Sequence, residues 1–274
     1  MNQNQPILYK ALFPGKYLQG DGALNLLPEL ISGFGKNGMI LASPHSKNNL
    51  LQEAFPDGLP CAVVEFSGEC SEAEIARVSD VIRLQKFDVL VGMGGGKTID
   101  TAKIVADQCR IPVIIVPTIA STDAPCSGCA VVYTDSGVYS HVYNQRMNPE
   151  VVLVDLKVIA HAPVRFLVSG MGDALATWFE ARSCDRTHSM NTCGGHSTLT
   201  ALTLARLCYD TLLRHGAAAK LANENKIVTP ALNHIVEANT LLSGLGFESS
   251  GLAAAPSINH GLTAIDSMAT ATSD

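Results

Sequence analysis

The stretch DVLVGMGGGKTIDTAK, residues 88–103, decides the fold of this chain. Its opening residues are mostly apolar and β-branched, which is typical of an interior strand of a parallel sheet. Four of the next five residues are glycine, so the backbone can approach a ligand without interference from a Cβ atom. A helix from Thr98 would point unpaired N–H groups and its positive dipole end at the same place. We therefore expect a phosphate-binding loop, with Lys97 adding a full positive charge.

Two common phosphate motifs do not fit this loop. A Walker loop needs a glycine where Val91 stands, and a Rossmann fingerprint needs a third glycine where Lys97 stands. The sequence therefore predicts a glycine-rich phosphate loop of another kind. The alternative is a tight turn without a ligand, but three consecutive glycines would then weaken strand and helix for no gain.

Composition limits the class of protein. A chain of 274 residues forms one or two domains with a sizeable core, and 47% hydrophobic with 16% charged residues indicates a globular fold. The net charge of −6 and the lack of a long basic run argue against nucleic acid as the main partner. No apolar stretch reaches membrane-spanning length, and the polar residues 1–5 do not resemble a signal peptide.

Eight cysteines without a secretion signal indicate reduced thiols in a cytoplasmic protein. Cys126 and Cys129 have the C-x-x-C spacing of a redox motif or of half a zinc site. No second C-x-x-C completes a structural zinc site, and Pro125 with Gly128 favours an ordinary loop.

Strands and helices alternate in the first half of the sequence. Strands are expected at 38–43, 61–66, 88–91, 112–116 and 151–155, and helical spacing at 24–30, 71–86 and 98–107. This alternation predicts an α/β fold with a parallel sheet covered on both faces. Residues 14–17 predict a turn, and residues 130–134 predict one arm of a hairpin that turns at 135–137.

The pattern changes after Pro163. Helical spacing runs through 165–181, 199–214 and 230–243, and β-branched runs disappear. We therefore expect an α/β domain at residues 1–162 and an all-helical domain at residues 163–274.

Two further segments carry candidate site residues. The short polar side chains of residues 120–127 follow a strand directly, and ligands bind at the carboxyl ends of strands in open α/β sheets. Asp173 lies in a mostly apolar helix, where an acid is costly to bury unless it is paired or binds a metal; a capping or helix-dipole role is the alternative. His260 is a possible ligand, although a single histidine is more often a structural group.

Three segments together resemble the iron-containing (group III) alcohol dehydrogenase family, and among its members those that oxidise glycerol. They are GGGKTIDTAK (94–103), PTIASTDAPCS (117–127) and GDALATWFEAR (172–182), and the similarity runs from about Pro14 to Ile265. The resemblance implies a Rossmann-like parallel-sheet domain followed by an all-helical domain of the dehydroquinate-synthase-like kind. It also implies a cytoplasmic homo-oligomer that oxidises glycerol, or a related small diol, to dihydroxyacetone with NAD and zinc in the cleft between the domains.

The same resemblance implies roles for individual residues. Asp123 faces the substrate and Asp173 is a metal ligand, so these two are the catalytic candidates. Gly96 and Lys97 lie at the cofactor pyrophosphate. The cofactor-binding set as a whole is Gly94, Gly95, Gly96, Lys97, Thr118, Ser121, Ser127, Cys129 and Tyr133, with the last three on the nicotinamide side.

The sequence departs from the family pattern at the metal. The second ligand, a histidine in the family, is replaced by Pro256, and Ser273 stands at about the place of the third, so two of three zinc ligands are missing. His260, one helical turn beyond Pro256, is the remaining candidate. Several family helices are also lacking. We expect a C-terminally truncated, incomplete helical domain with weak or no zinc binding and little turnover.

Other functions stay open at this point. The chain could be another metal-dependent alcohol or diol dehydrogenase, or a lyase resembling dehydroquinate synthase on the same architecture. It could also be a cofactor-binding fragment that holds NAD without chemistry. A phosphotransferase is disfavoured by the missing Walker glycine and by the lack of a second magnesium-binding acid in the right context.

Overall fold

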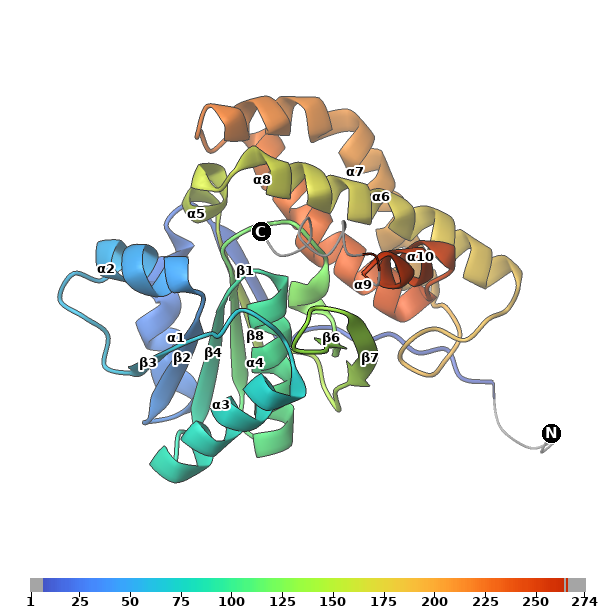
Figure 1. The fold of residues 1–274 in the computed structure, drawn as a ribbon. Coiled ribbons are helices and arrows are strands. Elements are labelled where there is room, and N and C mark those ends of the chain that lie inside the picture. Colours follow the sequence, from blue (N-terminus) through green and yellow to red (C-terminus); the bar gives the residue numbers. More distant parts are fainter. Residues whose placement is uncertain (1–6, 264, 266–274) are drawn as a thin grey trace.

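The computed structural model describes residues 7–263 and 265 and has a parallel sheet at its centre (Figure 1). Within these residues the sheet has six strands, so the predicted α/β class is confirmed. Their order is β1 (Lys16–Gly20), β8 (Val151–Asp155), β5 (Val113–Pro117), β4 (Val89–Gly94), β2 (Gly38–Ala42) and β3 (Ala62–Glu65). Two further strands, β6 (Cys129–Tyr133) and β7 (Tyr139–Asn144), form the predicted hairpin.

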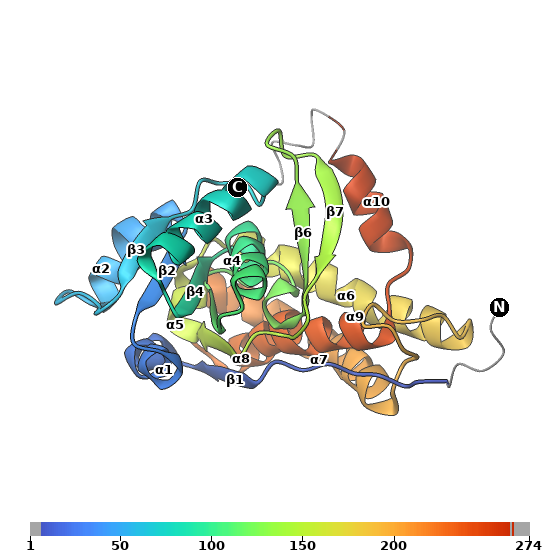
Figure 2. The same cartoon turned by 90° about the horizontal axis from the view of Figure 1, so that it is seen from below.

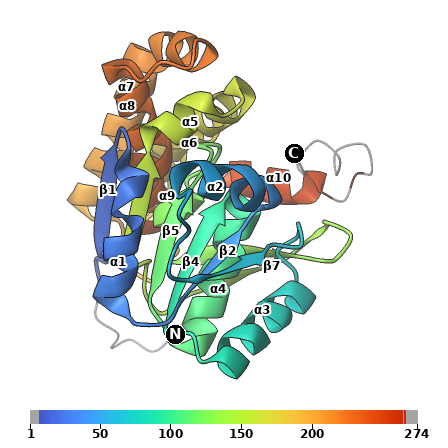
Figure 3. The same ribbon diagram turned by 90° about the vertical axis from the view of Figure 1, so that its left-hand side faces the viewer.

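Helices cover both faces of the sheet (Figure 3). Successive strand residues point to opposite faces. On β2, Met39 and Leu41 belong to the core beneath α3 (Glu72–Gln85) and α4 (Gly96–Cys109), whereas Ile40 and Ala42 belong to the core beneath α1 (Leu27–Phe34) and α2 (Leu51–Ala54). The helices on this half are η1 (Ala23–Leu26), α1 (Leu27–Phe34), η2 (Ser46–Leu50), α2 (Leu51–Ala54), α3 (Glu72–Gln85), α4 (Gly96–Cys109), η3 (Ala124–Cys126) and α5 (Leu156–His161).

The second half of the described chain is helical, as predicted, and lies in the upper part of Figure 1. Its elements are α6 (Val164–Arg186), α7 (Leu199–Glu224), α8 (Pro230–Glu237), η4 (Ala238–Leu242), α9 (Ser243–Ser250) and α10 (Ala254–Leu262). Polar caps fix where two of them begin. The Thr198 and Thr229 hydroxyls accept hydrogen bonds from first-turn amides of α7 and α8, and Pro230 occupies the first turn of α8. Figure 2 shows α10 beside the hairpin of β6 and β7, where Tyr139 N donates to Thr263 Oγ1 at 3.0 Å.

Two sequence expectations were wrong, and two helices were missed. The turn predicted at 14–17 is instead the start of β1, where Lys16 lies opposite Val151. A five-residue edge strand with one neighbour carries too little alternation to be recognised. The central helix begins at Gly96 rather than Thr98, and Gly94 belongs to β4. The short helices α5 and α10 were not predicted.

The division proposed at residues 162/163 falls between α5 and α6 and remains a prediction. In the part of the chain that the structure describes, no helix has the length and apolarity needed to cross a bilayer.

Candidate active site

A cavity of about 1680 Å³ lies between the carboxyl edge of the sheet and the helical half. Its position follows from the topology. The connections after β2 and β4 leave in opposite directions, since β2 leads to β3 at the edge and β4 leads to β5 on the other side. Such a switch point opens a crevice at the carboxyl ends of the two strands. Ser43 follows β2 and Gly95 follows β4, and both line the cavity.

The first turn of α4 faces this cavity. Gly95 is its N-cap and supplies no side-chain hydrogen bond, and the first backbone bond of the turn runs from Ile99 N to Gly95 O at 3.0 Å. The amides of Gly96, Lys97 and Thr98 therefore have no partner within the helix. A Cβ atom on Gly96 would meet nothing closer than Thr122 Oγ1 at 3.7 Å. The open backbone fits an anionic group such as a pyrophosphate.

Gly94 has a different role from the other glycines of the loop. A Cβ atom there would lie 2.7 Å from Thr98 Oγ1, so glycine is needed for β4 and α4 to pack. Gly94 does not line the cavity.

Lys97 is paired with an acid that the sequence did not reveal. Its Nζ donates to Glu69 Oε2 at 2.7 Å and lies 5.3 Å from the centre of the Tyr133 ring. Glu69 follows β3 and Lys97 follows β4, so both residues lie at the carboxyl edge of the sheet, and this shared edge was the signal available in the sequence. A bound phosphate would compete with Glu69 for this ammonium group.

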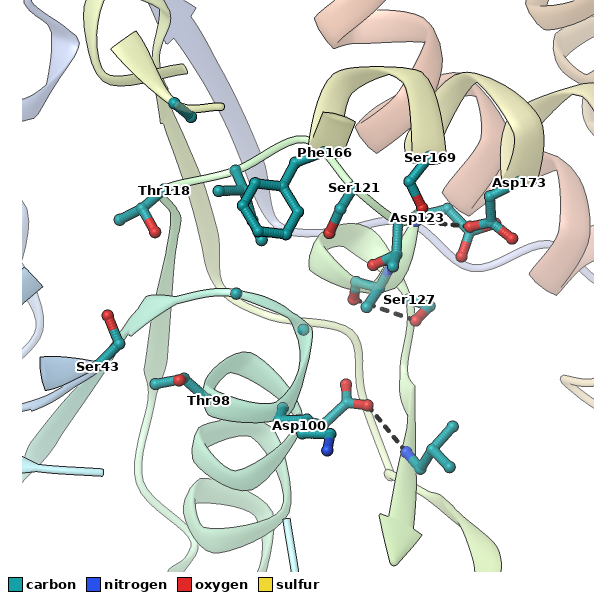
Figure 4. A pocket seen from close by; sticks show the side chains of 18 of the residues that line it. Ser43, Thr98, Asp100, Thr118, Ser121, Asp123, Ser127, Phe166, Ser169 and Asp173 are labelled. Carbon is teal, nitrogen blue, oxygen red and sulfur yellow. Dashed lines mark hydrogen bonds between the residues drawn. The ribbon is translucent and has the colours of Figure 1, made fainter. Parts of the chain in front are cut away.

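Asp123 and Asp173 come together from different halves of the chain (Figure 4). Asp123 N donates to Asp173 Oδ2 at 3.3 Å, and Ser243 Oγ donates to Asp123 Oδ2 at 2.8 Å. Burial, and then the charge of Asp173, raise the pKa of Asp123 well above its ordinary value. Burial also raises the pKa of Asp173 to about 6. The pair therefore favours a proton or a cation near neutrality.

The described residues do not supply a three-ligand metal site. Among them, no group of three or more His, Cys, Asp or Glu side chains is placed to hold a metal ion. Pro256, at the position where the family resemblance calls for a histidine, lines the cavity. The side chain of His260, and Ser273, lie outside the described residues. Asp173 is thus the one family ligand that the structure describes.

The remaining predicted cofactor residues share the cavity. With the exception of Gly94, all of them line it: Gly95, Gly96, Lys97, Thr118, Ser121, Ser127, Cys129 and Tyr133. Phe166 and Ser169 also line it from the start of α6 (Figure 4), and helical spacing gave no sign of this.

The C-x-x-C segment is an ordinary loop in the structure. All eight cysteines of the chain are free thiols. Burial raises the pKa of Cys129 to about 11 and that of Cys126 further still. Neither thiol is therefore activated as a thiolate.

The carboxylate pair should make stability depend on pH. Because the folded-state pKa of Asp173 is raised, its contribution to the free energy of unfolding is fully present below its unfolded-state pKa. That contribution is lost as the pH rises through about 6. Asp173→Asn lacks this loss. Relative to the variant, the parent should lose about 1 kcal/mol of its free energy of unfolding between pH 4 and pH 7. The loss is kept this small because water at the cavity wall screens Asp173. Urea unfolding of both proteins at several pH values measures this, and a difference independent of pH would contradict it.

Comparison with known proteins gives consistent results. The family model described as iron-containing alcohol dehydrogenase matches residues 14–156. The chain is 53% identical over 258 residues to the glycerol dehydrogenase of Thermotoga maritima, covering 93% of this chain and 71% of the relative. It is 47% identical over 256 residues to that of Escherichia coli O6:H1, covering 92% and 70%. The crystal structure of a probable glycerol dehydrogenase from Sinorhizobium meliloti 1021 matches with a TM-score of 0.89 and 44% identity, over 94% of this chain and 72% of the other.

Proposed function

The chain belongs to the iron-containing alcohol dehydrogenase family, and from that premise we propose that it oxidises glycerol to dihydroxyacetone with NAD as the hydride acceptor. The named relatives support glycerol, or a closely related small diol, as the substrate. The observation that carries the proposal is one cavity with an anion-binding helix end on one side and a carboxylate pair on the other.

The residues divide the cofactor between them. The amides of Gly96 and Lys97 would hold the pyrophosphate, and Thr118 and Ser121 would contact the cofactor beyond it. Ser127, Cys129 and Tyr133 would line the nicotinamide side. Bound NAD supplies the acceptor for a hydride from the substrate carbon.

The carboxylate pair would orient the diol. Oxidation of a secondary alcohol moves a hydride from carbon to the nicotinamide and releases the hydroxyl proton. Asp123 would face the substrate hydroxyl, and a carboxyl group whose pKa is raised well above its ordinary value by burial is suited to hold a proton in the cavity. Asp173, whose Oδ2 accepts a hydrogen bond from the backbone amide of Asp123, would hold that segment against the substrate.

Zinc is not assigned to the described residues, since Asp173 alone does not make a catalytic zinc site. This observation favours a second candidate function, in which the chain binds NAD without appreciable turnover.

Two measurements separate these functions. NAD titration followed by calorimetry tests the cofactor site, and NADH formation with glycerol, 1,2-propanediol and simple alcohols, with and without added zinc, tests turnover. Binding with glycerol turnover supports the dehydrogenase, whereas binding without turnover supports the second function. Failure to bind NAD would overturn both.

Glu69 should weaken the interaction of Lys97 with the cofactor phosphates. Glu69→Gln removes the competing carboxylate, so we expect NAD affinity to rise about threefold. Lys97→Met removes the cation and leaves Glu69 facing the phosphates, so affinity should fall about tenfold. Calorimetric titration of both variants tests this. Equal weakening in the two variants would show that Glu69 positions Lys97 instead of competing for it.

A further inference from the structure

The loop from Ala120 to Cys129, here called the 120–129 loop, carries Asp123 and Ser127 and leads into Cys129 at the start of β6. Only residues 124–126 form a helical turn, so most of the loop has no backbone ladder of its own. Side chains must therefore set its conformation, and besides Thr122 and Ser127 of the loop itself these come from elsewhere in the chain.

Lys103 holds this loop from the sheet side. It lies on α4, its side chain is fully buried, and its Nζ donates to Ala124 O at 2.8 Å and to Cys129 O at 2.5 Å. Asp100 Oδ1 lies 3.1 Å from the same ammonium group. The helix that begins at the proposed pyrophosphate site thus also fixes both ends of the segment around Ser127.

Glu248 holds the same loop from the helical side. It is 3% exposed on α9, and its Oε1 accepts a hydrogen bond from Gly128 N at 2.7 Å. Its Oε2 accepts from Asn148 Nδ2 at 2.6 Å, and that amide also donates to Cys126 O at 2.9 Å. A Cβ atom on Gly128 would lie 2.8 Å from Asn148 Oδ1 and 3.1 Å from Glu248 Oε1. Glycine at this position therefore permits the carboxylate to approach the backbone.

The helical run of η4 and α9 lies alongside the 120–129 loop. Asn239 Nδ2 donates to Ala120 O at 3.0 Å, and Ser243 Oγ donates to Asp123 Oδ2 at 2.8 Å. Contacts at Ala120, Asp123 and Gly128 thus come in order from one continuous helical run. Glu248 is the last of these and does not itself line the cavity.

We propose that Glu248 is a positioning residue, which fixes the Gly128 amide so that Ser127 and Cys129 keep the nicotinamide side of the cavity in shape. This inference rests on the proposed function, because the nicotinamide side is assigned there. A buried carboxylate is retained at a cost in desolvation, and here burial raises the pKa of Glu248 while the bonds from Asn148 and Gly128 oppose that rise. Support of this kind behind a binding wall sets its geometry.

The test compares two ligands that differ only at the nicotinamide. ADP-ribose has the adenosine, the pyrophosphate and the second ribose of NAD but lacks the ring. Glu248→Ala should weaken NAD at least tenfold and ADP-ribose less than twofold in calorimetric titrations. Glu248→Gln loses the bond from Asn148, because its amide nitrogen cannot accept one. It keeps an oxygen that can accept from Gly128 N, so it should recover most of the NAD affinity.

Hydrogen exchange provides a readout that needs no cofactor. The Gly128 amide should exchange at least tenfold faster in Glu248→Ala than in the parent, since its buried acceptor is gone. Unchanged exchange would overturn the inference even if NAD binds normally. If NAD and ADP-ribose weakened equally, the nicotinamide-specific role would be overturned.

Asn223→Ala is the matched control. Asn223 is also buried in the helical half, but it donates to the carbonyls of Ile159 and Ala160, far along the chain from the loop. This variant should lose stability without changing the ratio of NAD to ADP-ribose affinity. A parent protein that binds neither ligand would overturn the proposed function, and the exchange rate of Gly128 would then report separately on whether Glu248 holds the loop.

Discussion

Replacing Gly170 with alanine should destabilise the protein by about 3 kcal/mol and lower glycerol oxidation at least ~100-fold. Gly170 lies on α6, where an added Cβ atom would lie 2.0 Å from Ala120 O and 2.5 Å from Asn239 Nδ2. Because Ala120 O is backbone, it cannot rotate away. The helix and the 120–129 loop must separate, and Asp173 and Asp123 move apart with them.

Urea unfolding and NADH formation measure the two effects. Gly33→Ala is the control, because Gly33 is also helical, on α1, and a Cβ atom there would meet nothing within 4 Å. That substitution should leave turnover unchanged and stabilise the protein by up to about 1 kcal/mol. A Gly170→Ala protein as stable as the parent would show that α6 and the loop do not touch as described.

Replacing the buried Lys103 with methionine should lower the free energy of unfolding by about 3–5 kcal/mol. This is the largest loss of stability that we expect from a single substitution. The substitution leaves the carboxylate of Asp100, which is 7% exposed, without its partner. It also removes the ammonium donor from the carbonyls of Ala124 and Cys129, which keep only the longer contacts with the Ser127 hydroxyl. Burial alone would lower the pKa of Lys103, but Asp100 and Cys129 raise it above its ordinary value, so the lost group is a cation.

A double variant shows whether the unpaired charge is the cause. Asp100→Asn together with Lys103→Met should regain about 1–2 kcal/mol over Lys103→Met alone, because no buried carboxylate remains unpaired. Lys220→Met is the control, since Lys220 pairs with Glu224 on an exposed helix face and should change stability by less than about 0.5 kcal/mol. Chemical denaturation of the four proteins decides the matter; equal losses for Lys103→Met and the double variant would refute the charge argument.

Local patterns were sufficient for the centre of the fold. β4 and α4 were predictable because apolar β-branched residues, glycines and a helical repeat occur within one short segment. The same holds for β8, whose predicted and observed ranges agree at Val151–Asp155. In the helical half, α6 and α7 were predictable because they are long enough to show their spacing.

Pairings between distant residues were not predictable. Glu69 meets Lys97, and Glu248 meets Gly128, across stretches of chain whose course no local pattern describes. The position of the carboxylate pair, by contrast, was approached through a family resemblance and not through spacing. The loop that carries Asp123 is shaped by α9, so its geometry appears only once both halves are in place.

The edge strand β1 has a consequence for how the sheet assembles. β1 comes first along the chain, yet it pairs with β8, which comes last of the sheet strands. On a ribosome, residues 16–20 therefore emerge long before their neighbour is synthesised. Closing so long a loop is entropically costly and slow. We expect β2 to β5 to form first and the amino-terminal segment to dock as a late event in folding, which pulsed hydrogen exchange during refolding would detect as delayed protection of Tyr17 to Gln19.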